Sequence, residues 1–134
     1  YKNMNAYKLF VLDVGLLGAM TELPAESILE GNDIFVEFKG ALTEQYVLQQ
    51  LISDTPYTPY YYGNEKATFE QDFLIQKAKS IVPIEVKAEQ NIRSHSLKTY
   101  CEKFQPEEAV RFSTLKYKEQ ERMVNIPLYA VCNL

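Results

Sequence analysis

Three charged side chains in the middle of the chain have the types and spacing of a metal site. Asp72 is followed by Glu85 and Lys87, which stand two residues apart in the apolar run 81–88. In an extended strand such side chains share a face, roughly 7 Å apart, so that Glu85 and Lys87 flank the same cavity without having to pair. Carboxylate oxygens are the hard ligands that Mg²⁺ and Mn²⁺ prefer. A cation between Asp72 and Glu85 would therefore be well matched chemically.

A hairpin is the element that would bring these residues together. Residues 68–76 and 81–88 both have the composition of strands, and only four residues separate them. So short a link predicts antiparallel pairing, which places Asp72 beside Glu85. Strict alternation also places Glu70 on the face of Asp72, and Gln71 on the opposite face with Phe73. Two carboxylates at close range repel each other unless a cation or a shared proton lies between them.

A third carboxylate comes from the strongest helical pattern of the chain. Residues 37–53 carry apolar side chains mostly three and four positions apart, which builds one broad stripe. Glu44 stands at the edge of that stripe, near Ala41 and Leu48, and is therefore drawn towards the protein body.

The remaining pattern predicts an α/β fold with helices around a mixed sheet. Further strands are expected at 7–13, 58–62 and 109–113, and further helices at 15–20, 24–30 and 94–104. Residues 114–122 are polar and predict a loop, whereas 126–131 are apolar and fit either a helix or a strand. We expect one domain, with a strand and short helices in 1–36 and the main core in 37–134.

Bulk composition limits the range of functions. The 134 residues are 46% hydrophobic and 24% charged, which is typical of a globular domain. The formal net charge of −4 does not favour a dedicated duplex-DNA binder, although a local basic strip can coexist with it. No signal peptide or membrane span is visible, and Cys101 and Cys132 lack partners at metal-ligand spacing, so a cytoplasmic location is expected. The chain lacks an initiator Met, which suggests a fragment of a longer protein.

The sequence resembles the C-terminal domain of bacterial and archaeal P-loop ATPases of the AAA type, a domain regarded as similar to the PD-(D/E)XK, restriction-endonuclease-like superfamily. The resemblance implies a mixed-sheet core of that kind, DNA as a partner, and an ATPase domain in the same parent chain. No phosphate-cradling glycine motif is present, so ATP would bind only in a missing N-terminal part. The matching segments, in the family's order, are 7–10, 13–17, 39–47, 60–62, 70–73, 83–87, 93–97, 111–113 and 126–130.

The resemblance also implies a role for each residue of the site. Asp72 and Glu85 would bind Mg²⁺ or Mn²⁺ with the Val86 carbonyl, and Glu44 would complete the metal shell or hold a metal-bound water. Lys87 would orient or deprotonate the attacking water and offset charge on the phosphate. A divalent ion lowers the pKa of bound water and neutralises charge that develops on a phosphodiester. Glu70 is a further candidate, and Gln71 departs from the small apolar residue usual in the family.

Three functional hypotheses stay open. The chain is a metal-dependent phosphodiesterase acting on DNA, a catalytically silent nuclease-fold module that binds DNA or protein, or an interaction or oligomerisation domain that regulates the ATPase. The intact acidic and lysine set favours the first hypothesis, and the acidic total charge favours the other two. Arg93 and Lys98 are candidate contacts to a phosphate backbone, or part of a solvated helix face.

Overall fold

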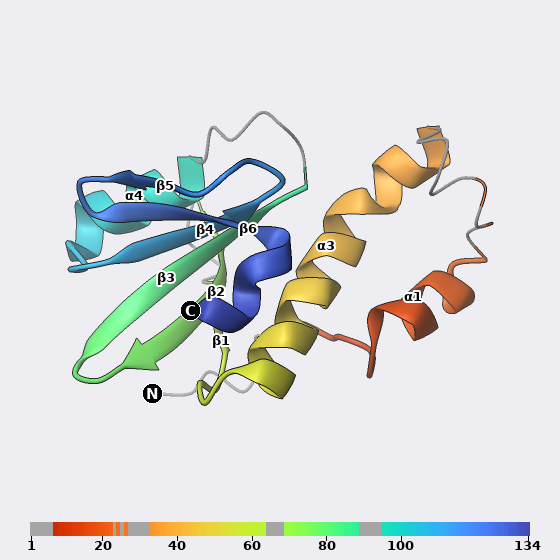
Figure 1. Cartoon of the computed structure of the whole chain (residues 1–134), viewed down its shortest axis with the longest axis horizontal. Coiled ribbons are helices and arrows are strands. Elements are labelled where there is room, and N and C mark those ends of the chain that lie inside the picture. Colours follow the sequence, from red (N-terminus) through yellow and green to blue (C-terminus); the bar gives the residue numbers. More distant parts are fainter. Residues whose placement is uncertain (1–6, 23, 25, 27–32, 64–68, 89–94) are drawn as a thin grey trace.

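A mixed sheet forms the centre of the molecule (Figure 1). The computed structural model describes residues 7–22, 24, 26, 33–63, 69–88 and 95–134. In these residues six strands pair in the order β1-β2-β3-β4-β6-β5. Their bounds are β1 Tyr60–Tyr62, β2 Gln71–Lys77, β3 Ser80–Lys87, β4 Ala109–Ser113, β5 Lys118–Gln120 and β6 Met123–Pro127.

Both pairing directions occur in this sheet. Strands β1, β2 and β3 are antiparallel neighbours, whereas β3, β4 and β6 run parallel, and β5 closes one edge antiparallel to β6. The predicted α/β class with a mixed sheet is confirmed, and it is compatible with a restriction-endonuclease-like core. The helical elements are α1 Val14–Met20, α3 Asp33–Asp54, α4 His95–Phe104 and the 3-10 helix η1 Leu128–Asn133.

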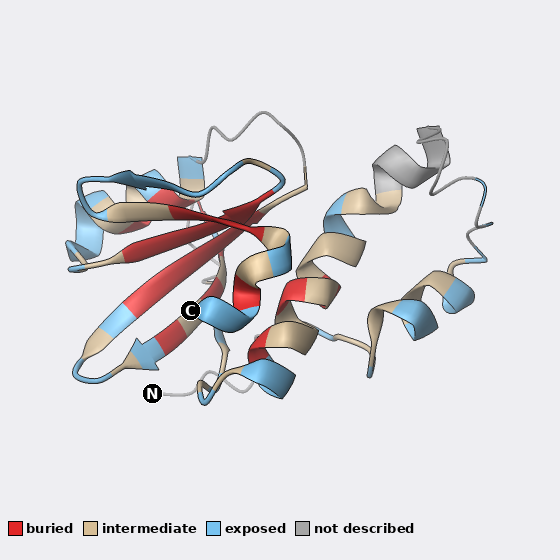
Figure 2. Ribbon diagram, in the orientation of Figure 1, coloured by how far each residue is buried: buried red, intermediate tan, exposed pale blue. Residues whose placement is uncertain are grey.

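The main core lies between the sheet and α3. Val47 and Leu51 of α3 and Val131 of η1 pack against the inward side chains of β2, β3, β4 and β6. Figure 2 shows the buried residues concentrated in these strands and on the side of α3 that faces them. Helix α4 lies across the sheet from α3 and buries Leu97 and Tyr100. In the described residues, no helix has both the length and the apolar character needed to cross a membrane.

The β2–β3 hairpin forms as predicted. Its register runs from Phe73 opposite Ile84 to Lys77 opposite Ser80, which leaves two residues in the turn. The first of them, Ala78, has a φ of 55°. A positive φ at this position suits the twist of a two-residue hairpin, but it is costly for any residue with a Cβ.

The predicted strand at 7–13 is wrong. This segment joins no described strand, and the backbone groups of Val11 bond instead to a side chain of α3. The Val11 N–H donates to Gln45 Oε1 at 3.0 Å, and Gln45 Nε2 donates to the Val11 carbonyl at 2.9 Å. The Val14 N–H donates to Gln49 Oε1 at 3.0 Å. Two glutamines of the helix thus take the place of a neighbouring strand.

The other secondary-structure predictions, before and after the central hairpin, had mixed outcomes. The loop predicted at 114–122 contains the short strand β5, whose three residues are all exposed. The apolar run 126–131 is divided between the end of β6 and η1. The short helix at 15–20 agrees with α1, and the strand at 109–113 agrees with β4. The helix predicted at 24–30 lies mostly outside the described residues.

Candidate functional site

The candidate site lies where β2 and β3 separate. Their regular ladder ends at Phe73 and Ile84. Beyond that pair, side chains take over the backbone hydrogen bonds: Asp72 Oδ2 accepts from the Val86 N–H at 2.8 Å, and Gln71 Nε2 donates to the Ile84 carbonyl at 2.7 Å. The opening between the strands is therefore stabilised by two of the residues that the sequence marks out.

A register shift lies on the other side of β2, in its pairing with β1. Tyr60 pairs with Leu74, and Tyr62 pairs with Gln71, so β2 advances three residues while β1 advances two. Such a bulge bends a strand and redirects side chains, and bulges are common beside active sites.

Asp72 lies near Glu85, as the hairpin predicts, and the charge of Glu85 contributes to the raised pKa of Asp72. Gln71 is buried, as is Phe73, and its Nε2 lies 3.3 Å from Glu85 Oε2. Asp72 also lies by Lys8, with 3.7 Å between Oδ1 and Nζ. Gln71 and Asp72 both lie in the part of β2 where its pairing with β1 shifts register.

Lys8 joins the helix carboxylate to the strand carboxylate. Its Nζ donates to Glu44 Oε2 at 2.8 Å, and the same Nζ faces Asp72. Burial lowers the pKa of Lys8, but the hydrogen bond to Glu44 and the charges of Glu44 and Asp72 raise it above 10.5, so the ammonium stays charged. The sequence analysis missed Lys8, although a lone cation inside the apolar run 7–12 is a signal that could have found it.

Glu85 and Lys87 make direct contact, contrary to the expectation that they need not pair. Lys87 Nζ lies 2.7 Å from Glu85 Oε1, and the Glu85 side chain is only 5% exposed. A carboxylate buried this deeply needs a charged partner, since removing it from water is costly. Arg111 stands opposite Glu85 in β4 and donates from Nε to Asn125 Oδ1 at 3.0 Å. Burial lowers the pKa of Arg111, and the charge of Glu85 opposes that shift.

The negative charge of the Asp72 carboxylate is only partly offset by the positive charge and the hydrogen-bond donor near it. Burial raises its pKa from 3.8 to about 7, and the negative charges of Glu44 and Glu85 act in the same direction. The hydrogen bond from Val86 and the positive charge of Lys8 lower the pKa, but not enough to restore it. Near neutral pH, Asp72 therefore exchanges a proton readily.

The donor atoms of the site suit a divalent cation in kind. Glu44, Asp72 and Glu85 offer hard carboxylate oxygens, and the pKa of Asp72 is raised first by burial and then by the charges of Glu44 and Glu85. In their present positions the side chains do not enclose an ion: no three His, Cys, Asp or Glu residues of the described chain form such a group. The reason is that Glu44 faces Lys8 and Glu85 faces Lys87. A shell would form if Lys8 released Glu44 and Asp72, and if Glu85 turned away from Lys87.

Gln71 leaves one buried atom without a partner. Its side chain is fully buried, and its Oε1 accepts no hydrogen bond in the described structure. The amide cannot simply be turned round, because the two groups near Nε2 are both acceptors. An unpaired buried oxygen costs about 1–3 kcal/mol, so this position is suited to a donor such as a trapped water.

The remaining candidates lie at the edge of the site or away from it. Glu70 is exposed and accepts a hydrogen bond from the Tyr61 hydroxyl at 3.0 Å. The side chain of Lys98 is 77% exposed and lies 3.8 Å from Glu102, which fits a solvated helix face. Arg93 lies outside the described residues.

Comparison with known proteins gives one match. Residues 39–131 match a family described as "Domain of unknown function (DUF4143)". The chain belongs to the DUF4143 family. Neither the curated proteins nor the solved structures contain a match to this chain.

The DUF4143 region contains most of the candidate site. It spans Glu44, Asp72, Glu85 and Lys87, whereas Lys8 precedes it. A small cavity of about 180 Å³, lined by Lys8, Glu44 and Gln45 among others, lies where the preceding segment meets α3. Within this DUF4143 protein, the site is thus completed by a residue from outside the matched region.

Proposed function

We propose that this domain is a metal-dependent phosphodiesterase of the nuclease type that acts on DNA. The observation that carries the proposal is the mostly buried Asp72 carboxylate, which shares the Lys8 ammonium with Glu44, at 3.7 Å and 2.8 Å, and lies near the buried Glu85. Carboxylates crowded in this way store electrostatic repulsion, which a divalent cation would relieve. The choice of DNA as substrate, and of an ATPase domain in the parent chain, rests on the family resemblance of the sequence.

Each residue has a part in this proposal. Asp72, Glu85 and Glu44 would hold Mg²⁺ or Mn²⁺, with the Val86 carbonyl as a further oxygen donor. When bound, the ion would supply a water of lowered pKa and positive charge beside the phosphate. Lys87 reaches the site with a side chain that is 31% exposed, so its ammonium can meet both a buried carboxylate and an incoming phosphate. Lys8 contacts both Glu44 and Asp72, and a bound ion would take over the positive charge that its ammonium supplies there.

A specific observation favours a second candidate function. Lys8 and Lys87 already pair with Glu44 and Glu85 at 2.8 Å and 2.7 Å, so two of the three carboxylates have a counter-charge without any ion. A catalytically silent module that binds DNA or protein, and thereby regulates an attached ATPase, would have no need to break these pairs.

Cleavage of DNA separates the two functions. We expect the purified domain to cut supercoiled plasmid or branched DNA with Mg²⁺ or Mn²⁺, and expect Lys87→Ala to slow cleavage by roughly 10²–10⁴-fold. Lys118→Ala, at an exposed position of β5, is the matched control and should cut like the wild type. A wild-type domain that binds Mn²⁺ and DNA but cuts neither substrate would support the silent module instead.

A further inference from the structure

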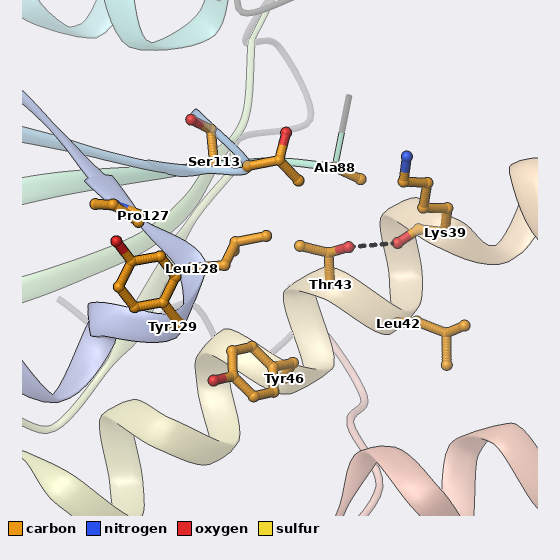
Figure 3. A pocket seen from close by; sticks show the side chains of 10 residues that line it. Lys39, Leu42, Thr43, Tyr46, Ala88, Ser113, Pro127, Leu128 and Tyr129 are labelled. Carbon is orange, nitrogen blue, oxygen red and sulfur yellow. Dashed lines mark hydrogen bonds between the residues drawn. The ribbon is translucent and has the colours of Figure 1, made fainter. Parts of the chain in front are cut away.

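A second cavity lies beside the candidate site and has no role in the proposed chemistry. It has a volume of about 540 Å³ and opens between α3 and the carboxyl ends of β3, β4 and β6 (Figure 3). Lys39, Thr43 and Tyr46 of α3 form one wall, and Ala88, Leu128 and Tyr129 belong to the other. Open α/β sheets commonly bind ligands outside the carboxyl ends of their parallel strands.

The sheet register ties this cavity to the candidate site. Lys87 is paired with Ser113 of β4, and Ser113 is paired with Pro127 of β6. Ser113 and Pro127 both line the cavity, and Ala88 follows Lys87 directly. A ligand that extends out of the cavity past Ala88 would therefore reach Lys87, which directly precedes Ala88 in the chain.

The lining combines flat apolar surface with one positive charge. Of the described residues that line the cavity, Lys39 is the only charged one, in a chain whose formal net charge is −4. The Lys39 ammonium has no ion pair in the described part of the chain, and Figure 3 shows it reaching up from α3 towards the level of Ala88. Tyr46 and Tyr129 supply two aromatic rings, and Leu128 extends between them and Thr43.

These features match a molecule with a flat ring and an anionic group. Ligand pockets of this volume are mostly apolar, with a few polar groups that fix orientation. Aromatic side chains stack on nucleobases, and lysine meets phosphate as a point charge. Tyr129 is 82% exposed, so its side chain can stack on the ring of a bound ligand.

We propose that this cavity binds one nucleotide unit, with its base against Tyr46, Leu128 and Tyr129 and its phosphate at Lys39. The unit is either a free nucleotide or the unpaired end of a nucleic-acid strand. The second source rests on the proposed function, because the strand would then continue past Ala88 to Lys87.

Nuclear magnetic resonance without metal tests the site directly. The ¹⁵N-labelled domain is titrated, in EDTA, with deoxyadenosine 5′-monophosphate, with deoxyadenosine and with inorganic phosphate. We expect the mononucleotide to shift the amide signals of Leu42, Thr114 and Leu128, and to bind more tightly than the other two probes. No shifts at these residues with millimolar mononucleotide, or equal binding of inorganic phosphate alone, would overturn the proposal.

Two matched pairs of variants assign the roles. Tyr129→Ala should weaken mononucleotide binding by roughly five- to tenfold, in line with the loss of one stacking ring. Tyr60→Ala, which removes a 55% exposed ring from β1, should not. Lys39→Met should make the binding of a short oligodeoxynucleotide less dependent on salt. A plot of the logarithm of the binding constant against the logarithm of the salt concentration should have a slope smaller in magnitude by about one, whereas Lys118→Met should leave that slope unchanged. Equal losses in a variant and its control would refute the assignment.

The same titration distinguishes the two sources of the nucleotide and separates this inference from the proposed function. A strand of five nucleotides that binds at least tenfold more tightly than the mononucleotide would identify a strand end, whereas a mononucleotide that binds better would identify a free nucleotide. Asp72→Asn should leave mononucleotide binding in EDTA intact, because the cavity does not include Asp72. A cavity that binds in this way remains a nucleotide site even if the domain never binds Mn²⁺.

Discussion

Asp72 is the residue on which the site depends. Its carboxylate accepts the Val86 N–H, faces Lys8, and lies within the field of two other carboxylates. Burial and these like charges raise its pKa from 3.8 to about 7. The folded protein therefore binds a proton at Asp72 more tightly than the unfolded chain does, and ionised Asp72 opposes folding.

Replacing Asp72 by a neutral isostere should stabilise the protein in a pH-dependent way. Because the pKa of Asp72 is raised in the folded state, the free energy of unfolding of the wild type falls as pH rises from about 4 to about 7. Asp72→Asn keeps an acceptor for Val86 and has no charge to lose. At pH 8 we expect it to exceed the wild type by roughly 2–4 kcal/mol, with a much smaller difference at pH 4, as measured by urea unfolding.

Glu70→Gln is the control for this prediction. Glu70 is a neighbouring carboxylate that is exposed and bonded to Tyr61. Its replacement should change stability little at either pH. An Asp72→Asn variant that gains nothing between pH 4 and pH 8 would show that Asp72 is not held in the crowded, buried state described above.

The elements set by local pattern were predictable from the sequence, and those set by distant partners were not. The β2–β3 hairpin, α3, α4 and β4 follow from periodicity, β-forming residues and short links. Residues 7–13 have the composition of a strand, but Val11 in this segment bonds to Gln45, 34 residues away. Strand β5 is polar and fully exposed, so no apolar alternation marks it.

The same division holds for the site. Alternation correctly placed Glu85 and Lys87 together, because β3 is regular over its whole length. The bulge beside Gln71 and Asp72 was not predictable, since it arises from the pairing of β2 with β1 and has no signal in the local sequence. Lys8 was missed because only the folded chain brings it to Glu44, 36 residues away.

The turn of the hairpin offers a simple test of its backbone geometry. Ala78 is exposed and has a φ of 55°, a conformation that glycine adopts without the steric cost of a Cβ. We expect Ala78→Gly to raise the free energy of unfolding by about 0.5–1 kcal/mol. The matched change Ala41→Gly, at an exposed position of α3, should lower it by about 1 kcal/mol. Destabilisation by Ala78→Gly would argue against the positive φ.

Gln45 should control whether the segment 7–13 stays on α3. Its side chain is 2% exposed and makes both of the hydrogen bonds to Val11, so Gln45→Leu keeps the core contacts but loses those bonds. Hydrogen exchange of the Val11 amide should then be roughly ten- to a hundredfold faster, with the amides of β3 unchanged. Gln50→Leu, on the same helix and without a hydrogen bond of its side chain among the described residues, should leave Val11 protected. Equal protection of Val11 in all three proteins would contradict the role of Gln45.

At the scale of the whole molecule, a net negative chain concentrates its functional charges in one opening of the sheet. The formal charge is −4, and the site joins α3, β2 and β3 with Lys8 from a segment that precedes the DUF4143 region. A chain of this charge gains nothing from general attraction to DNA. The nuclease function that we propose therefore requires that the site recruit a divalent ion.

Binding of Mn²⁺ tests this dependence most directly. Titration calorimetry at pH 7.5 should give a single Mn²⁺ site in the wild type, with release of protons, because Asp72 is partly protonated in the metal-free protein. The site should be lost in Asp72→Ala and Glu85→Ala, and kept in Glu70→Gln. If the wild type binds no Mn²⁺ at millimolar concentration, or if Asp72→Ala binds it equally well, the account of this site as a metal centre is contradicted.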